Sequence, residues 1–309
     1  MKEKYKHISI GVMCRWFGIS RQAYYQHEWI LEEEVFQCDL LLEKVREIRE
    51  KHPRMGVRKL QERLRPFMSE NGIKMGRDAL FDLFSAHRML IRTRRSHIIK
   101  TTNSRHWLKK YPNLIVDFTP SKPNELWVSD ITYWEIQGQP VYINLITDAY
   151  SRKIIGHHLS DNLRAAETKK ALEMALSGLK KRSETSEQLI HHSDRGLQYC
   201  STLYVNLLRE NHIKSSMTQR GDPLENAMAE RVNGIIKGEY LFSYKCNNIE
   251  DARKLLTQAV SLYNEERPHS SIGNLAPEVA HSQYHQIGDK IKRLWKNYYS
   301  TKNTCVNPI

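Results

Sequence analysis

The sequence predicts an α/β protein in which one mixed β-sheet flanked by helices follows an all-helical N-terminal region. Before residue 96, apolar residues recur at helical spacing, and after Pro123 runs rich in β-branched and aromatic residues take over. The element order predicted for the second part, βββαβαβα, is typical of a single mixed sheet with helices packed against it. The chain has 309 residues, which is enough for two domains, one of them with a full core.

The charge balance predicts a polyanionic partner. Lys and Arg total 48 against 35 Asp and Glu, a net charge of +13. Nucleic acid and an anionic membrane both fit this balance, but no apolar run approaches the roughly 20 residues that span a bilayer. The first twenty residues also lack the apolar core of a signal peptide. We therefore expect a cytoplasmic protein that binds nucleic acid and no membrane.

The cysteines predict neither a disulfide framework nor a metal site. There are five of them, they are scattered, and no CxxC pair occurs. The His and Cys residues near the N-terminus lack the paired spacing of zinc ligands. We therefore expect no zinc.

Residues 1–30 have the pattern of a helix-turn-helix-like segment. Within 8–27 an amphipathic stretch is followed by a turn at Gly18, an N-cap at Ser20 and a second helical stretch. The second helix of such a unit can enter a DNA groove, and an ordinary helical hairpin is an equal alternative.

Residues 31–95 predict a helical DNA-binding domain. We expect helices over 33–50, 57–70 and 77–86, with Asn71-Gly72 ending the second of them. The last two helices form a second helix-turn-helix candidate. Basic side chains surround the first of this pair, including Arg58, and they favour contact with phosphates.

A basic linker is expected over 96–120, between this domain and the sheet. The stretch Leu83–Val116 holds eight Lys or Arg and no Asp or Glu. We expect it to be flexible and to touch DNA through Arg92, Arg94 and Arg95, so that residues 1–116 bind DNA without the rest of the chain. The last segment, 286–309, is expected to be a second basic tail.

The part that carries the sheet, 121–285, alternates between strand and helix patterns. Strands are expected over Leu126–Trp134, Val141–Thr147, Lys153–Leu159, Leu189–His192 and Ile213–Met217. Helices are expected over Ala165–Leu179, Ser201–Glu210, Asn226–Glu239 and Asp251–Tyr263. The first three strands should form an antiparallel meander.

Three carboxylates on separate elements stand out as candidate metal ligands. Asp130 lies inside an otherwise apolar strand, where a carboxylate must be solvated, paired or bound to metal. Asp194 ends the fourth strand, and strand ends in α/β folds commonly hold active-site groups. Hard oxygen ligands of this kind suit Mg²⁺ or Mn²⁺, and two such ions could support displacement at phosphorus.

The third carboxylate, Glu230, belongs to a polar stripe on the predicted helix 226–239. Asn226, Glu230, Asn233 and Lys237 are spaced four, three and four residues apart, so they share one face. A solvated helix face would give the same stripe. Glu225 is expected at the helix start and Glu239 on the opposite side of the helix, so neither should complete the metal site.

Several motifs together resemble the bacterial insertion-sequence transposases of the IS-three family and, more distantly, retroviral integrases. The motifs are WVSDIT at 127–132, HSDRGLQY at 192–199, ENAMAE at 225–230, YNEERPHS at 263–270 and HPRMGVR at 52–58. Asp194 and Glu230 are 36 positions apart (230 − 194), so 35 residues separate them, which matches the spacing of that family. The resemblance covers about residues 45–285. One departure is Arg231-Val232-Asn233 where many members have Ser-Phe-Phe.

The resemblance implies an RNase H-like integrase catalytic core that cleaves and joins DNA strands with two Mg²⁺ or Mn²⁺ ions held by Asp130, Asp194 and Glu230. It implies double-stranded DNA as substrate, both element ends and target, and a homo-oligomer on that DNA. An upstream-frame transposase protein, or a fusion with it, is a further implied partner. DNA contacts are expected from Lys237, Arg195, Asn226, Asn233, Arg267, His269, Arg58, Arg92, Arg94 and Arg95. A non-catalytic DNA-binding regulator and a plain RNase H-type nuclease are the alternatives.

Overall fold

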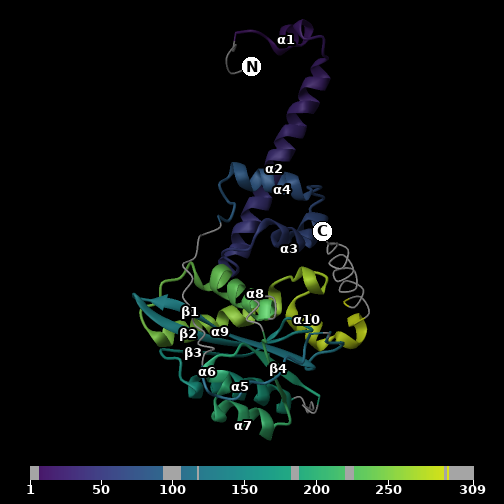
Figure 1. Ribbon diagram of the computed structural model, residues 1–309. Coiled ribbons are helices and arrows are strands. Elements are labelled where there is room, and N and C mark those ends of the chain that lie inside the picture. The colour runs from purple at the N-terminus through teal and green to yellow at the C-terminus, as the bar shows by residue number, and fades with distance from the viewer. Residues whose placement is uncertain are drawn as a thin grey trace, which may run out of the picture. The chain divides into compact units, whose positions relative to one another are not determined.

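The computed structural model describes residues 7–92, 106–116, 118–181, 188–219, 226–288 and 291 (Figure 1). The chain divides into two compact units. The first consists of Met1–Lys51 and Gly56–Leu90, and the second of His52–Met55 and Ile91–Ile309. The boundary between the two units thus lies between Leu90 and Ile91.

The first unit is helical, as predicted, but its helices are divided differently. They are α1 (Ile10–Trp16), α2 (Arg21–Lys51), α3 (Val57–Glu70) and α4 (Arg77–Ala86). α2 is one continuous helix that crosses the expected boundary at residue 30. The reason is local, because no Gly or Pro occurs between Arg21 and Lys51 to end it. The Ser20 side chain accepts a bond of 3.0 Å from Ala23 N, in agreement with its predicted role as N-cap.

The core of the first unit lies between α3, α4 and the second half of α2. Its buried residues are Leu41, Leu42, Val45, Ile48, Leu60, Leu64, Leu80 and Phe84. Between α3 and α4 the chain turns at Asn71 and at Gly72, whose φ of +66° favours glycine. The predicted helix pair of 57–70 and 77–86 is therefore present. No residue of α2 before Leu41 is buried.

The second unit is built on a five-stranded mixed sheet. Its strands are β1 (Leu126–Ile136), β2 (Gln139–Asp148), β3 (Ile154–Ser160), β4 (Ile190–Ser193) and β5 (Lys214–Met217). The strand order is β3-β2-β1-β4-β5, with β1, β2 and β3 antiparallel and β4 and β5 parallel to β1. The predicted meander and the predicted mixed sheet are both confirmed.

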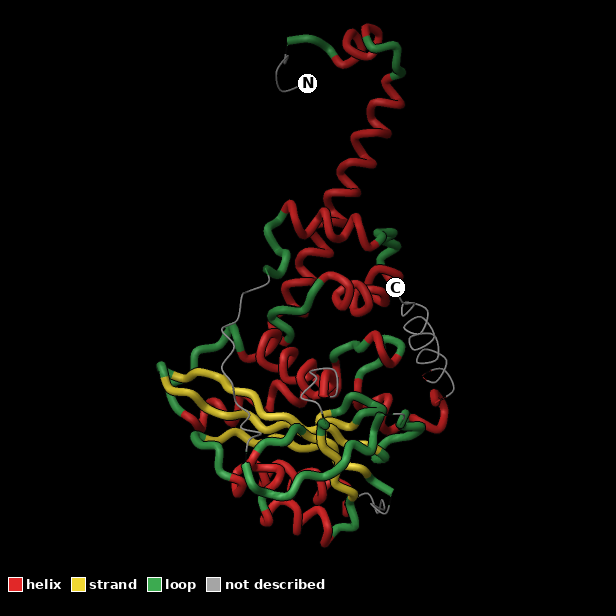
Figure 2. The backbone as a smooth tube through the Cα atoms, viewed as in Figure 1, coloured by secondary structure: helices red, strands yellow, loops and turns green. Residues whose placement is uncertain are grey.

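Helices cover both faces of this sheet (Figure 2). One face carries α5 (Ala165–Lys181), α6 (Leu197–Cys200) and α7 (Thr202–Glu210), whose apolar residues form one core with Trp127 and Ile146. The other face carries α8 (Ala227–Ile235), the π-helix η2 (Ile236–Leu241) and α9 (Ile249–Glu266), which pack on Ile143 and Leu145. Alternate residues of each strand thus enter opposite cores.

Close packing fixes α5 against the sheet. A Cβ atom at Gly156 in β3 would lie 2.2 Å from the carbonyl oxygen of Ala171, so only glycine fits there. This close contact allows α5 to pack directly against β3.

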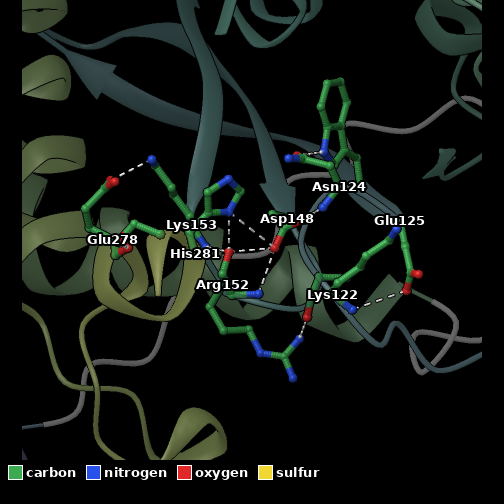
Figure 3. A network of polar contacts seen from close by, with 12 residues as sticks. Lys122, Asn124, Glu125, Asp148, Arg152, Lys153, Glu278 and His281 are labelled. Atoms are coloured by element: carbon green, nitrogen blue, oxygen red, sulfur yellow. Dashed lines mark hydrogen bonds and ion pairs between the residues drawn. The ribbon is translucent and has the colours of Figure 1, made fainter. Parts of the chain in front are cut away.

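A polar network attaches helix α10 (Pro277–Ser282) to the end of β2 (Figure 3). Asp148 accepts hydrogen bonds from the backbone of Asn124 and Ser151, each 2.7 Å long. The Ser151 hydroxyl lies 3.0 Å from Nδ1 of His281, and Lys153 pairs with Glu278 at 2.6 Å. Burial by itself raises the pKa of Asp148, but hydrogen bonds and the His281 ring lower it below its usual value. This network holds the residues after α9 on the second unit.

Within the described part of the chain, none of the helices combines the length and the apolar character that crossing a membrane requires.

Candidate active site

The parallel pairing of β1 and β4 brings two of the predicted acids together. The register matches Trp127 with His191 and Val128 with His192. Continuing it by two residues places Asp130 level with Asp194, and neighbouring strands are about 4.8 Å apart. After burial, the negative charge of Asp194 is the next cause that raises the pKa of Asp130, in keeping with this proximity.

Asp130 lies in an environment that disfavours its charge. It is half-buried, and its pKa is raised to about 7, first by burial and then by the charges of Asp194 and Glu230. Two hydrogen bonds act in the opposite direction, one from Asn233 Nδ2 to Asp130 Oδ2 at 2.8 Å and one from the backbone of Ile131. A site of this kind attracts a positive charge.

The loop after β4 fixes the second carboxylate. Gly196 N donates to Asp194 Oδ1 at 2.9 Å. A Cβ atom at Gly196 would itself lie 2.9 Å from that oxygen, so a larger residue would displace the carboxylate. The neighbouring Arg195 is half-buried, and its Nε donates to the carbonyl of Thr218.

The polar stripe of α8 lies along β1, next to Asp130. Asn226 Nδ2 donates to Ser129 O at 3.1 Å, and Lys237 Nζ donates to Tyr133 O at 2.9 Å. Lys237 also lies 4.0 Å from the centre of the Tyr133 ring, and burial lowers its pKa. The stripe predicted from spacing is therefore a contact surface between α8 and β1, rather than a solvated face.

Glu230 occupies the exposed position of this stripe. It lies between the buried residues Asn226 and Asn233, and its charge reaches Asp130. Among the residues that the structure describes, no three His, Cys, Asp or Glu side chains are gathered closely enough to hold a metal ion. The chain thus brings two acids together and leaves the third facing solvent beside them.

The donor set nevertheless fits a hard divalent cation. The Oδ1 atoms of Asn226 and Asn233 are buried and have no hydrogen-bond partner in the described structure. The same two side chains bond through Nδ2 to β1, at Ser129 O and Asp130 Oδ2, so amide and carboxylate oxygens occur close together here. Mg²⁺ and Mn²⁺ prefer oxygen atoms of this kind as ligands.

A buried polar layer beneath the two aspartates was not predicted. The hydroxyls of Ser129 and Tyr199 are 2.9 Å apart, and Tyr204 OH lies 2.9 Å from Nε2 of His191. Burial, together with the adjacent His192, lowers the pKa of His191 to about 3. The sequence signal was the pair of histidines inside a short strand, where one ring must face each core.

Four predicted DNA contacts are corrected by the structure, because their side chains are buried; Asn226 and Asn233 bond to β1 instead. Arg267 and His269 are both buried, with 3% and 8% of their surface exposed. Arg267 forms two bonds to Glu239, of 2.7 and 2.8 Å, and its Nη1 lies 3.1 Å from His269 Nε2. Neither side chain is available to DNA, because both are buried and the Arg267 guanidinium is paired with Glu239 inside the fold.

The same ion pair explains the direction of the Glu239 side chain, which was expected to face away from the metal site. It lies on the π-helix η2, where the rotation per residue differs from that of an α-helix, and it points to Arg267. Glu225 lies outside the described residues.

The remaining basic residues have varied positions. Arg58 on α3 and Arg92 after α4 are exposed, so both could reach DNA. Arg94 and Arg95 fall outside the described residues.

Comparisons with known proteins agree with this architecture. Residues 120–223 and 211–277 match two models, each described as an integrase core domain. A 31 kDa protein of insertion element IS600 from Shigella sonnei is 37% identical over 282 residues, which cover 89% of this chain and 99% of that protein. The transposase of insertion sequence IS629 from Shigella sonnei is 27% identical over 92% of this chain and 94% of its own.

Part of the chain is also similar to solved structures at lower sequence identity. The catalytic core domain of HTLV-2 integrase in complex with magnesium is 19% identical, with a TM-score of 0.40, over 52% of this chain and 97% of that one. The two matching family models, together with the mixed five-stranded sheet whose strands lie within the matched residues, define the class as an integrase core.

The family follows from the relatives that match nearly end to end. The chain belongs to the bacterial insertion-sequence transposases that carry an integrase core, and it is a polynucleotidyl transferase that acts in DNA transposition and integration.

Proposed function

We propose that the enzyme cleaves and joins DNA strands with Mg²⁺ or Mn²⁺ held by Asp130, Asp194 and Glu230. The observation that carries the proposal is the parallel register of β1 and β4, which brings Asp130 and Asp194 level with each other; burial and the charge of Asp194 raise the pKa of Asp130 to about 7. Two like charges so close are favourable when a divalent cation lies between them. Glu230 stands beside them on α8 and completes the set when its carboxylate turns toward the cation.

The side chains of the protein have separate parts in this chemistry. Two bound ions would activate the attacking oxygen and neutralise the leaving oxygen of an in-line displacement at phosphorus. Asn233 holds one oxygen of Asp130 by a hydrogen bond. Gly196 N fixes Asp194 from the side of the loop. Lys237 adds a positive charge one turn of helix from Asn233, where a DNA phosphate would approach.

DNA binding is assigned to the basic surfaces outside the two carboxylates. Arg58 on α3, Arg92 and the acid-free stretch Leu83–Val116 supply phosphate contacts, with Arg94 and Arg95 in the same stretch. Arg195 and Lys237 supply contacts near the site. The substrates are the two ends of the insertion sequence and the target duplex. We further propose that the chain works as a homo-oligomer on this DNA, together with an upstream-frame transposase protein or as a fusion with it.

A strand-transfer assay tests the proposal. An oligonucleotide with the element end is incubated with the purified chain, a target duplex and Mg²⁺, and joined products are counted. We expect joining with Mg²⁺ or Mn²⁺ and none in excess chelator, whereas Ca²⁺ should support DNA binding with little joining. Full joining in excess chelator would contradict the metal assignment. DNA binding without cleavage or joining would indicate a regulator, and cleavage without joining a nuclease.

The acids themselves can be tested by metal binding as well as by activity. Isothermal titration of Mn²⁺ into the protein should give weaker binding for Asp130→Asn and Asp194→Asn than for wild type. Asp161→Asn, an exposed aspartate after β3, is the matched control and should bind as wild type does. Equal Mn²⁺ affinity in all four proteins would remove Asp130 and Asp194 from the site.

A further inference from the structure

The first half of α2 and the turn before it form an unusually apolar surface. Nine of the nineteen exposed large hydrophobic residues in the described part of the chain lie between Trp16 and Phe36. Trp29 is 67% exposed and Phe36 is 62% exposed, although both are large apolar side chains. The buried positions of α2 begin only at Leu41, so no residue of the first half of the helix enters the core. An exposed apolar patch of this kind marks a surface for another protein segment.

Most exposed apolar residues of α2 lie in two rows along the helix. At about 100° per residue, Tyr25, Trp29 and Phe36 form one apolar ridge, and Leu31 and Val35 form a second. Three carboxylates lie between the ridges. The resulting shallow groove is lined by Glu28, Leu31, Glu32, Val35, Phe36 and Asp39.

The charge of the groove excludes DNA, which the sequence predicted as the partner of this N-terminal region. Residues 28–43 contain six Asp or Glu and no Lys or Arg, within a chain of net charge +13. DNA phosphates would be repelled there. Two copies of the same face would also repel each other, because carboxylates would meet carboxylates. The occupant must combine large apolar side chains with Lys or Arg.

Outside the described residues, one segment combines aromatic side chains with cations and contains no acid. Residues 292–302 include Leu294, Trp295, Tyr298 and Tyr299, at the spacing that an amphipathic helix uses. Four cations accompany them, and no acid occurs from residue 290 to the end of the chain. The cations are Lys292, Arg293, Lys296 and Lys302.

We propose that the α2 groove binds residues 292–302 of a second copy of this chain. The apolar side chains of the segment would lie against the two ridges, and its cations against Glu28, Glu32 and Asp39. The segment starts from a fixed point, because Ile291 is fully buried in the second unit with Tyr150, Ile272 and Ala280. When two chains exchange their segments, both grooves are covered and the assembly closes as a symmetric pair.

A charge-swap experiment on the full-length chain, without DNA or metal, tests this pairing. The groove variant carries Glu28→Lys, Glu32→Lys and Asp39→Lys, and the tail variant carries Lys292→Glu, Arg293→Glu and Lys296→Glu. The matched control carries Glu34→Lys, Glu50→Lys and Glu70→Lys, which make the same charge change at exposed positions outside the groove. Circular dichroism confirms that each variant is folded, and sedimentation velocity measures association.

Wild type and the control should dimerise, and each of the other variants should do so at least about tenfold more weakly. An equimolar mixture of the groove and tail variants should associate again, because the basic tail of one meets the acidic groove of the other. A monomeric wild type, unchanged association of both variants, or no association in the mixture would overturn the proposal. If wild type is monomeric, a labelled peptide of residues 290–303 is added to a form truncated after Gly288. Binding of that peptide would show that the tail occupies the groove of its own chain.

Discussion

Asp130 is the residue at which the electrostatics of the site are most evident. A half-buried carboxylate next to Asp194 is difficult to ionise, and its pKa of about 7 reflects this. Hydrogen bonds from Asn233 and from the backbone of Ile131 offset only part of the cost. The positions of Asp130 and Asp194 are therefore better explained by a bound cation than by the stability of the fold.

Glu230→Gln should abolish cleavage and joining while DNA affinity and fold stay near wild type. The substitution removes a charge at an exposed position and changes little volume, so the fold has no reason to respond. Strand transfer and fluorescence anisotropy with labelled DNA measure the two properties separately.

The matched control for that variant is Glu225→Gln. Removing an acid near the start of a helix should cost at most about 1 kcal/mol of stability, and joining should remain measurable. An inactive Glu225→Gln beside an active Glu230→Gln would mean that the third ligand has been misassigned.

His191 gives the protein an acid-sensitive core. Its pKa falls to about 3 in the folded state, chiefly through burial, against about 6.5 in the unfolded chain. Above pH 6.5 the ring is neutral in both states and stability is fully present. As the pH falls from 6.5 toward 3, the unfolded chain takes up a proton that the folded chain refuses. Stability should then fall by up to about 1.4 kcal/mol per pH unit for this residue.

Urea unfolding at pH 7 and at pH 5 measures this loss. His191→Gln removes the titrating group and should reduce the difference between the two pH values, even if the variant is less stable at both. His285→Gln, at an exposed position, should leave the difference unchanged. The same pH dependence in His191→Gln and in wild type would refute the assignment.

Single residues also show where sequence reasoning succeeds and fails. Asp130 and Asp194 could be chosen because each interrupts or ends an apolar strand, and the parallel register then sets them level. Arg267 could not be assigned in the same way. Its motif marks it as important, but only the packing of η2 against α9 turns it inward to Glu239.

At the scale of the elements, the π-helix η2 directly extends the helix that carries Glu230. The ion pair of Glu239 with Arg267 ties η2 to the residue that follows α9. His52, in the short segment of the second unit that follows α2, lies 3.0 Å from the hydroxyl of Tyr240 on η2. The segment that contains His52 and the residue that follows α9, Arg267, therefore both contact η2.

Arg267→Ala should lower the free energy of unfolding by about 2–4 kcal/mol. The change leaves Glu239 largely inside the protein without its cation, and breaking a buried pair is costly, although the partial exposure of Glu239 reduces the loss. Lys169→Ala, which breaks the exposed pair with Glu173, should cost less than about 1 kcal/mol. Urea denaturation compares the two. A loss no greater for Arg267→Ala than for Lys169→Ala would show that the pair contributes little.

The predictability of an element depended on where its signals lie. The three strands of the meander were found because alternating patterns and short turns are local. The long helix α2 was divided in two, since Gly18 and Ser20 suggested a compact hairpin and the apolar residues that follow have no core to face. The end of α8 was missed because nothing in residues 236–241 distinguishes a π-helix from an α-helix.

At the scale of the whole chain, charge is distributed unevenly along the sequence. Residues 28–43 are acidic, whereas Leu83–Val116 holds eight Lys or Arg and no acid. The net charge of +13 therefore combines two opposite stretches. The acidic one suits a basic protein segment, and the basic one suits DNA. The sequence could reveal these stretches, but only the exposure of the apolar residues on α2 separates their partners.

Replacing Arg92, Arg94 and Arg95 together by Ala should flatten the salt dependence of DNA binding. Each phosphate contact releases counterions and contributes about 0.9 to the slope of log K against log salt concentration. The full chain with Glu230→Gln, which should bind without joining, is titrated with labelled duplex at several salt concentrations. Ala at Lys169, Lys180 and Lys181 of α5 removes the same charge elsewhere and should leave the slope near its original value. If the two triple variants flatten the slope equally, the effect belongs to net charge alone, and the three arginines do not contact phosphates.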